Sequence, residues 1–408
     1  MKFMYFPLPA LPATLEERRR ERPIAYRTER WQKMLDEVVE LARMAEDLGF
    51  EAITFPEHHL ATEGLEIGSI PLLSLYVALH TKTIKVGPIG YVLPGWDPLR
   101  LAVEIGWLDQ MTKGRTIVGM ARGYQTRWLN QMGQFLHVGA TVSDQSEVDQ
   151  ANRRAFEEVF HILRLAWKDE AFRFKGEFYQ YPYPYEEGTP WPPTGWTTEF
   201  GDPGEVGKDG RLHKISVVPK PYQKPHPRLF QAFSISEATI RWCAKEDIVP
   251  MILMSHPDVL RGLVSAYVDS AAKAGRTLER GKSVGVLRQI YFGNSDEDIF
   301  RQSEMGAVGL LWKRFWGYFG FWEAFKSPEE QESGRLLPPT EWTIDRLRKF
   351  HYVYAGSVKD VRKGMDVLVE AGNPEYFAWL SDQGMLPLEE VKRQLRTFGE
   401  EVLPHYRG

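Results

Sequence analysis

Residues 84–120 are predicted to form a strand, a helix and a second strand, and this unit constrains the fold more than any other segment. Ile84 to Val92 is apolar and β-branched, which is typical of a strand buried on both faces of a parallel sheet. Asp97 followed by proline indicates a helix start, Gly114 ends that helix, and Arg115 to Met120 is the second strand. Such a unit pairs its two strands in parallel through a right-handed crossover.

The same alternation of strands and helices extends along the whole chain. The other predicted strands are Lys2–Phe6, Ala52–Pro56, Arg228–Phe233, Val249–Met254, Ser283–Phe292 and Tyr376–Leu380, and the other predicted helices are Arg30–Leu48, Asn152–Trp167, Glu237–Lys245, Val259–Ala274, Val358–Ala371 and Leu388–Val402. This order predicts an α/β fold, a TIM (β/α)8 barrel, although the element count alone also allows an open parallel sheet. Because barrels with insertions reach this length, residues 1–408 are expected to form one domain.

Two insertions interrupt the alternation, at about residues 181–214 and 308–350. The first is crowded with proline and glycine, so we expect an irregular segment that serves as a lid or a linker. The second contains the aromatic run LLWKRFWGYFGFWEAFK, whose Lys313 and Arg314 exclude a membrane span. Aromatic side chains are favoured both at packing interfaces and in ligand pockets, so this run either packs on the barrel or a second subunit, or lines a substrate pocket.

The charge balance and the cysteine content exclude several classes of protein. The 51 basic and 55 acidic residues give a net charge of −4 without a long run of one sign, which argues against nucleic-acid and membrane-surface partners. Cys243 is the only cysteine, so no intrachain disulfide can form. Prolines interrupt the apolar N-terminus and break the pattern of a signal peptide. We therefore expect a cytoplasmic protein that acts on a small molecule.

Glu57, His58 and His59 follow a predicted strand at its carboxyl end, where parallel α/β folds place their chemistry. A metal site would need at least one further ligand, and the sequence has neither an HExxH pattern nor a cysteine cluster, so no metal is predicted. Neighbouring side chains on an extended segment point to opposite sides, so we expect the two histidines not to serve one site equally.

Three other residues are candidates for binding an anion. Ser236 lies between a predicted strand and a predicted helix, and Thr239 lies in the first turn of that helix. A helix start with free backbone N–H groups binds anions, although an ordinary capped helix without a ligand has the same pattern. Arg122 follows another predicted strand, and a buried arginine there needs either a phosphate or a carboxylate as its partner.

Seven segments, in order along the chain, resemble the bacterial luciferase-like, flavin-dependent monooxygenase family. They are EHH at 57–59, LPGWDPLRLA at 93–102, LDQMTKGR at 108–115, ARGY at 121–124, FKGEFYQY at 174–181, KPYQKPHPRLFQAFSISEATIRWCA at 220–244 and EEVLPHYR at 400–407. The resemblance covers most of the chain and weakens at about 182–213 and 308–350. The family resemblance implies a TIM barrel with its active site at the carboxyl ends of the strands.

The resemblance also implies roles for individual residues. His58 matches the family's catalytic histidine, which faces the reactive edge of the flavin. Ser236 and Thr239 align with the hydroxyl residues that hold the FMN phosphate, and Arg122 is implied to contact the flavin or its phosphate. Ala121 stands where luciferase has a reactive cysteine, so features that depend on that thiol are not carried over.

An oxygenation reaction follows from this resemblance. Reduced FMN and O₂ are expected to form a C4a-hydroperoxyflavin where water is excluded, and to oxygenate an apolar, bulky organic substrate. The sequence has no GxGxxG fingerprint after a strand, so reduced FMN is expected from a separate flavin reductase. A homodimer is expected as well. The alternatives are a coenzyme F420-dependent oxidoreductase on the same scaffold and a non-catalytic flavin-binding relative, against which the presence of His58 argues.

Overall fold

A computed structural model describes residues 1–65 and 70–407 of the chain. Its internal contacts divide the chain into two compact units. The first unit comprises Met1–Tyr91, Ile117–Met120 and Leu229–Gly408, and the second comprises Val92–Thr116 and Ala121–Arg228. Both units are therefore discontinuous in sequence.

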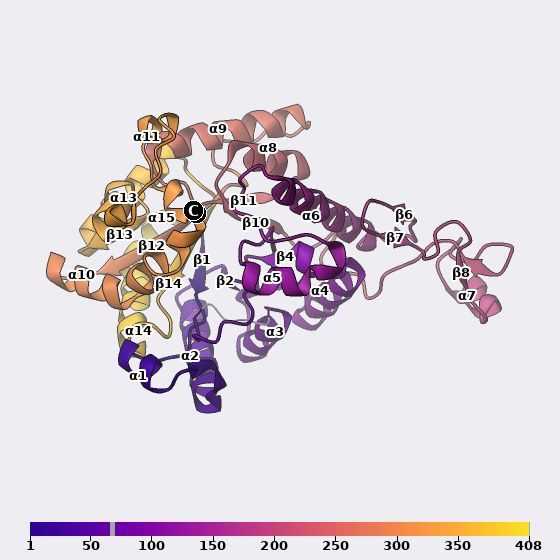
Figure 1. The fold of residues 1–408 in the computed structure, drawn as a ribbon, viewed down its shortest axis with the longest axis horizontal. Coiled ribbons are helices and arrows are strands. Elements are labelled where there is room, and N and C mark those ends of the chain that lie inside the picture. Colours follow the sequence, from indigo (N-terminus) through magenta and orange to yellow (C-terminus); the bar gives the residue numbers. More distant parts are fainter. Residues whose placement is uncertain (66–69, 408) are drawn as a thin grey trace. The chain divides into compact units, whose positions relative to one another are not determined.

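The first unit contains a parallel β-barrel (Figure 1). Its eight strands are β1 (Lys2–Pro7), β2 (Ala52–Phe55), β3 (Lys85–Pro88), β5 (Val118–Ala121), β10 (Leu229–Ser234), β11 (Val249–Ile252), β12 (Gly285–Phe292) and β14 (Tyr376–Ser381). They pair in parallel in the order β3, β2, β1, β14, β12, β11, β10, β5. The two ends of this series meet, because the Ile117 N–H beside β5 donates to the Val86 oxygen of β3 at 2.9 Å. The predicted TIM barrel is confirmed.

Two strands differ from the sequence prediction. The predicted strand Ile84–Val92 is divided into β3 and β4 (Tyr91–Val92). At the break, the backbone of Gly90 passes so close to β5 that a Cβ would lie 2.3 Å from the Gly119 carbonyl carbon. The strand β13 (Val353–Gly356) was not predicted, and it pairs with the second half of β12 where β14 departs.

Most helices of the first unit bury residues along one face, whereas the two short helices Leu15–Arg20 and Pro328–Glu332 bury none. They are α1 (Leu15–Arg20), α2 (Thr28–Asp47), α3 (Ile70–His80), α8 (Glu237–Glu246), α9 (Pro257–Lys273), α10 (Asp296–Met305), α11 (Pro328–Glu332), α12 (Ile344–Lys349), α13 (Val358–Ala371), α14 (Leu388–Thr397) and α15 (Leu403–Tyr406). In α2, the buried residues Val38, Leu41, Ala42 and Ala45 follow helical spacing, as the sequence predicts. The predicted helix Leu388–Val402 leaves α-helical geometry at Thr397 and continues as a π-turn.

The regular elements of the second unit are mainly helices. It contains α4 (Pro98–Thr112), α5 (Thr126–Met132), α6 (Glu147–Ala166), α7 (Thr194–Phe200) and the two-residue strands β6 (Phe174–Lys175), β7 (Gln180–Tyr181), β8 (Thr189–Pro190) and β9 (Arg211–Leu212). Asp97 caps α4 by accepting the Arg100 N–H at 2.8 Å, and α4 packs beside α6 (Figure 1). The insertion at 181–214 was predicted to be irregular, but it includes α7 and the antiparallel pair of β8 and β9.

The aromatic run of the second insertion forms a small core of its own. The Trp312 ring meets those of Trp316, Trp322 and Phe325, with centroids 4.6, 6.1 and 5.0 Å apart. The Trp322 indole donates to the Trp312 oxygen at 2.7 Å and stacks on Trp342. These rings are buried, so they stabilise the insertion by packing rather than by binding a ligand.

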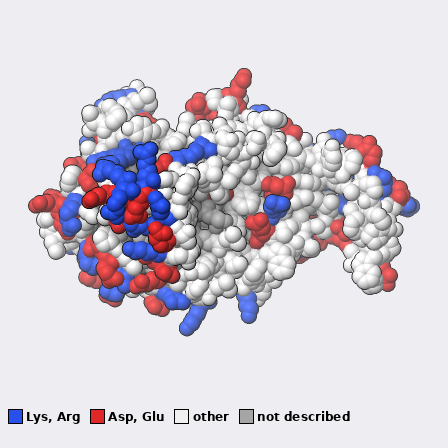
Figure 2. All heavy atoms as spheres, turned by 60° about the horizontal axis from the view of Figure 1, so that its bottom comes forward, with Lys and Arg blue, Asp and Glu red and all other residues white. Residues whose placement is uncertain are grey.

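The distribution of charges agrees with the sequence analysis. Figure 2 shows acidic side chains beside the basic ones on the face that it presents, including a group of Lys and Arg side chains bordered by Asp and Glu. Within the described residues, no helix is both long and apolar enough to cross a membrane.

Candidate active site

His58 follows β2 at the carboxyl end of the barrel strands and is 8% exposed. Burial, with a smaller effect of neighbouring His59, lowers the pKa of His58 to about 3. The ring is therefore neutral at physiological pH, with one nitrogen that donates and one that accepts a hydrogen bond. Such a ring can orient and stabilise a polar group but holds no proton to release near neutral pH.

His59 has different surroundings from those of His58. Its Nε2 lies 2.9 Å from Oε1 of Glu57, and its side chain is 22% exposed. The Glu57 side chain itself is 2% exposed, so this pair fixes the turn that follows β2. The two histidines are thus held in different ways.

Ser236 and Thr239 form the start of α8, as predicted. Ser236 is the N-cap residue, and its Oγ accepts the Thr239 N–H at 3.3 Å. The two hydroxyl oxygens lie 3.0 Å apart. Glu237 and Ala238 in the same turn are exposed, which leaves this helix start open to solvent. The structure therefore brings two hydroxyl groups and an accessible helix N-terminus together.

Arg122 lies in the second unit, directly after β5, and already has a carboxylate partner. Its Nη1 lies 2.6 Å from Oδ1 of Asp149, and its Nη2 donates to the Ser143 hydroxyl. Burial lowers the pKa of the Arg122 guanidinium, although Asp149 raises it. Of the two partners considered for Arg122, the carboxylate is present, whereas the phosphate contact stays a prediction.

Aromatic rings show which side chains point into the barrel. The strands β1 and β10 are separated by three strands in either direction around the barrel. The rings of Phe6 on β1 and Phe233 on β10 nevertheless meet, with centroids 6.5 Å apart. A contact between opposite strands crosses the lumen, so both rings lie inside the barrel. Gln289 shares this face, because Phe6 and Gln289 both pair with Leu380 of β14.

Asp382 is a buried acid at this end of the barrel that the sequence analysis missed. It follows β14, and its Oδ1 accepts hydrogen bonds from Gln289 at 3.0 Å, from Tyr291 at 3.2 Å and from the Ala307 N–H at 2.5 Å. Burial raises the pKa of Asp382 to about 6, against these hydrogen bonds, which lower it. Polar residues 381–383 directly after a predicted strand are the sequence signal that could have identified it.

Replacing Asp382 by asparagine is expected to stabilise the protein above pH 6. Folded Asp382 keeps its proton up to about pH 6, whereas the unfolded chain loses it near 3.8, so wild-type stability falls as the pH rises through this window. The difference between the folded and unfolded pKa of Asp382 corresponds to about 3 kcal/mol of unfolding free energy. The variant should recover about 1–2 kcal/mol of it, since its amide must replace the hydrogen bonds of the carboxyl group. Urea unfolding at about pH 8 and about pH 3.5 measures the effect, which should vanish at the lower pH. A variant less stable than the wild type at pH 8 would contradict the raised pKa.

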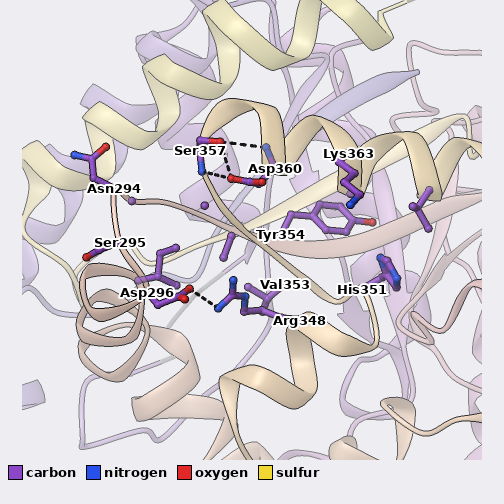
Figure 3. Close-up of a pocket in the computed structure, with 16 residues that line it drawn as sticks. Asn294, Ser295, Asp296, Arg348, His351, Val353, Tyr354, Ser357, Asp360 and Lys363 are labelled. Carbon is purple, nitrogen blue, oxygen red and sulfur yellow. Dashed lines mark hydrogen bonds and ion pairs between the residues drawn. The ribbon is translucent and has the colours of Figure 1, made fainter.

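A cavity of about 650 Å³ opens at the carboxyl ends of β12 and β13 (Figure 3). Its lining includes Arg348, His351, Tyr354, Ser357, Asp360 and Lys363. Arg348 pairs with Asp296 at 3.0 Å, and the Ser357 N–H and hydroxyl both donate to Asp360. His58, Ser236 and Thr239 do not line this cavity, so it is separate from the predicted flavin site.

Comparison with known sequences points to one family. A family model described as luciferase-like monooxygenase matches residues 1–373. The 3,6-diketocamphane 1,6-monooxygenase of Pseudomonas putida is 26% identical over 296 residues, which are 70% of this chain and 72% of that protein. The oxygenase component of the flavin-dependent trigonelline monooxygenase of Acinetobacter baylyi is 25% identical over 388 residues, with 92% and 90% covered.

Solved structures share the fold. The oxygenating constituent of 3,6-diketocamphane monooxygenase from Pseudomonas putida, in complex with FMN, gives a TM-score of 0.69 at 22% identity and covers 91% of this chain and 94% of its own. The coenzyme F420-dependent tetrahydromethanopterin reductase of Methanopyrus kandleri gives 0.64 at 15% identity, with 100% and 99% covered. The fold alone therefore does not choose between FMN and F420.

Proposed function

Because this chain belongs to the luciferase-like monooxygenase family, we propose that it is the oxygenase component of a two-component system that uses reduced FMN and O₂. The observation that carries this proposal is the placement of His58, Ser236 and Thr239 after β2 and β10, at the carboxyl end of the barrel strands. Active sites of TIM barrels lie at this end. A separate reductase would then deliver the reduced flavin.

The side chains at this end of the barrel fit FMN by their chemistry. The hydroxyl groups of Ser236 and Thr239 and the N-terminus of α8 would hold the phosphate, because both favour an anion. The half-buried Phe233 ring, which packs on Phe6 inside the barrel, offers an apolar surface to a flat ring system. For Arg122, the contact with the flavin or its phosphate is carried over from the family resemblance alone.

Bound reduced FMN would supply the electrons for splitting O₂, so that one oxygen atom enters the organic substrate and the other leaves as water. His58 contributes a neutral ring that donates or accepts one hydrogen bond in a buried position. Burial of His58 and the aromatic rings of the lumen exclude water, which otherwise diverts the reaction to hydrogen peroxide. The apolar lining favours an apolar and bulky substrate.

An F420-dependent oxidoreductase is the second candidate, because that enzyme class shares the fold. The two relatives from Pseudomonas putida and Acinetobacter baylyi are monooxygenases, which supports the first candidate. The presence of His58 after β2 argues against the third candidate, a non-catalytic flavin-binding relative.

Anaerobic titration of the purified protein with oxidised FMN, reduced FMN and F420 tests the proposed cofactor. We expect reduced FMN to bind with micromolar affinity or better, and F420 at least about tenfold more weakly, because its phosphodiester-linked tail does not match the two hydroxyl groups at α8. Riboflavin is the control that removes only the phosphate. Tighter binding of F420 than of reduced FMN would overturn the proposal in favour of the deazaflavin enzyme.

The expected homodimer and the cytoplasmic location remain part of this proposal. On α3, Leu72 and Leu79 lie two turns apart on one face and are 69% and 75% exposed. Exposed apolar residues in a row are typical of protein interfaces, which supports a second copy of the chain as partner.

A further inference from the structure

We propose that Phe321 is the residue through which the second insertion borders the reaction chamber, where it forms an apolar wall against the organic substrate. This inference rests on the proposed function, because it takes the carboxyl end of the barrel as the reaction site. Its starting point is that Phe321 is an aromatic residue of the insertion that meets a ring of the barrel lumen.

The insertion contacts the barrel end at Ala307 and at Phe321, among other residues. At its start, the Ala307 N–H donates to Asp382, which follows β14. Further along, the ring of Phe321 meets the ring of Phe233 at the end of β10, with centroids 6.0 Å apart. Because Phe233 also meets Phe6 across the lumen, the three rings form a continuous apolar series from the barrel interior to the insertion.

An irregularity in the backbone of β10 directs the Phe233 side chain into the barrel. The pairing of β10 with β11 shifts register between Gln231 and Ser234, and Phe233 has a φ of 47°, which non-glycine residues rarely adopt. Bulges of this kind re-aim side chains next to active sites. Ser236 follows three residues later, so the same turn presents an aromatic ring and the predicted phosphate site.

Phe321 also differs from the neighbouring aromatic residues of the insertion. The adjacent Trp322 points into the insertion core, where it contacts Trp312 and Phe325 and is 1% exposed. Phe321 is only half-buried and turns towards Phe233 instead. In the same run, Trp316 is 2% exposed in the core and Phe319 packs on Phe315.

The chain allows a direct test by thiol labelling. Its only native thiol, Cys243, is 0% exposed, so an engineered cysteine is the thiol that N-ethylmaleimide modifies. We expect saturating oxidised FMN to slow the labelling of Phe321→Cys by about fivefold or more, because the flavin fills the chamber beside it. Phe319→Cys, from the same short segment, is the matched control, and FMN should leave its labelling rate unchanged.

A second measurement follows the oxygen reaction without an organic substrate. Reduced FMN and O₂ then yield oxidised FMN and hydrogen peroxide, and we expect Phe321→Ala to release peroxide about tenfold faster than the wild type, since water enters where the ring was. Phe321→Leu should release peroxide at close to the wild-type rate. The control variant Phe319→Ala should release it at the wild-type rate. Labelling of Phe321→Cys that FMN does not affect, or wild-type peroxide release from Phe321→Ala, would overturn the inference. Failure of the wild type to bind FMN would instead overturn the proposed function.

Discussion

His58→Ala is expected to fold and to bind FMN like the wild type, yet to lose product formation by about a hundredfold or more, which is the usual scale for a positioned catalytic group. The reason is that His58 is a buried neutral ring at the end of β2, where its hydrogen bond can act on the oxygen that is being transferred. Peroxide yield should rise as product falls. Single-turnover mixing of the reduced complex with O₂ separates these two outcomes.

The neighbouring histidine provides the control for this variant. His59 is paired with Glu57 and partly exposed, so His59→Ala should cost less catalysis than His58→Ala. Because the pKa of His58 is lowered to about 3, His58 should contribute no rate change between about pH 5 and pH 8. Equal losses for the two variants, or wild-type turnover of His58→Ala, would show that His58 is structural.

Arg122→Ala is expected to weaken FMN binding by about 2 kcal/mol or more, through the loss of charge-assisted hydrogen bonds to the phosphate. Riboflavin has no phosphate, so its affinity should change much less. Isothermal titration of both ligands against both proteins gives the comparison.

The ion pair with Asp149 makes this experiment more demanding, because removing Arg122 leaves a buried carboxylate without its main partner. Urea unfolding of the variant therefore accompanies the titration. Arg153, which is 33% exposed and lies on α6 as Asp149 does, provides a control for net charge, and Arg153→Ala should leave both affinities unchanged. Equal losses of FMN and riboflavin affinity in Arg122→Ala would assign Arg122 to Asp149 alone.

The barrel could be predicted from the sequence because its elements are long and regularly spaced. Apolar strands and helices with one apolar face recur in α/β order, and seven of the predicted barrel strands lie within a few residues of their observed positions. The break after β3 could not be predicted, since it depends on the approach of Gly90 to Gly119, more than twenty residues away in sequence. The strand β13 is only four residues long and lies beside an insertion, where the alternation gives no guide.

Site residues could be predicted where their role depends on residues close in sequence, directly after a predicted strand. Ser236 caps α8 because the cap is set within three residues, and the sequence shows all of them. Asp382 was missed because its importance comes from Gln289, Tyr291 and Ala307, which join it only in the folded barrel. The sequence of the aromatic run likewise does not show towards which neighbours each ring points. The contact of Phe321 with Phe233, and of Trp322 with Trp312, is known only from the folded structure.

The most direct test of the account is rapid mixing of the anaerobic complex of reduced FMN with oxygenated buffer, in the absence of organic substrate. We predict that the protein slows the release of hydrogen peroxide by at least about tenfold relative to free reduced FMN, since the proposed site excludes water. Reoxidation and peroxide release at the rate of free reduced FMN, with the flavin shown to be bound, would contradict it.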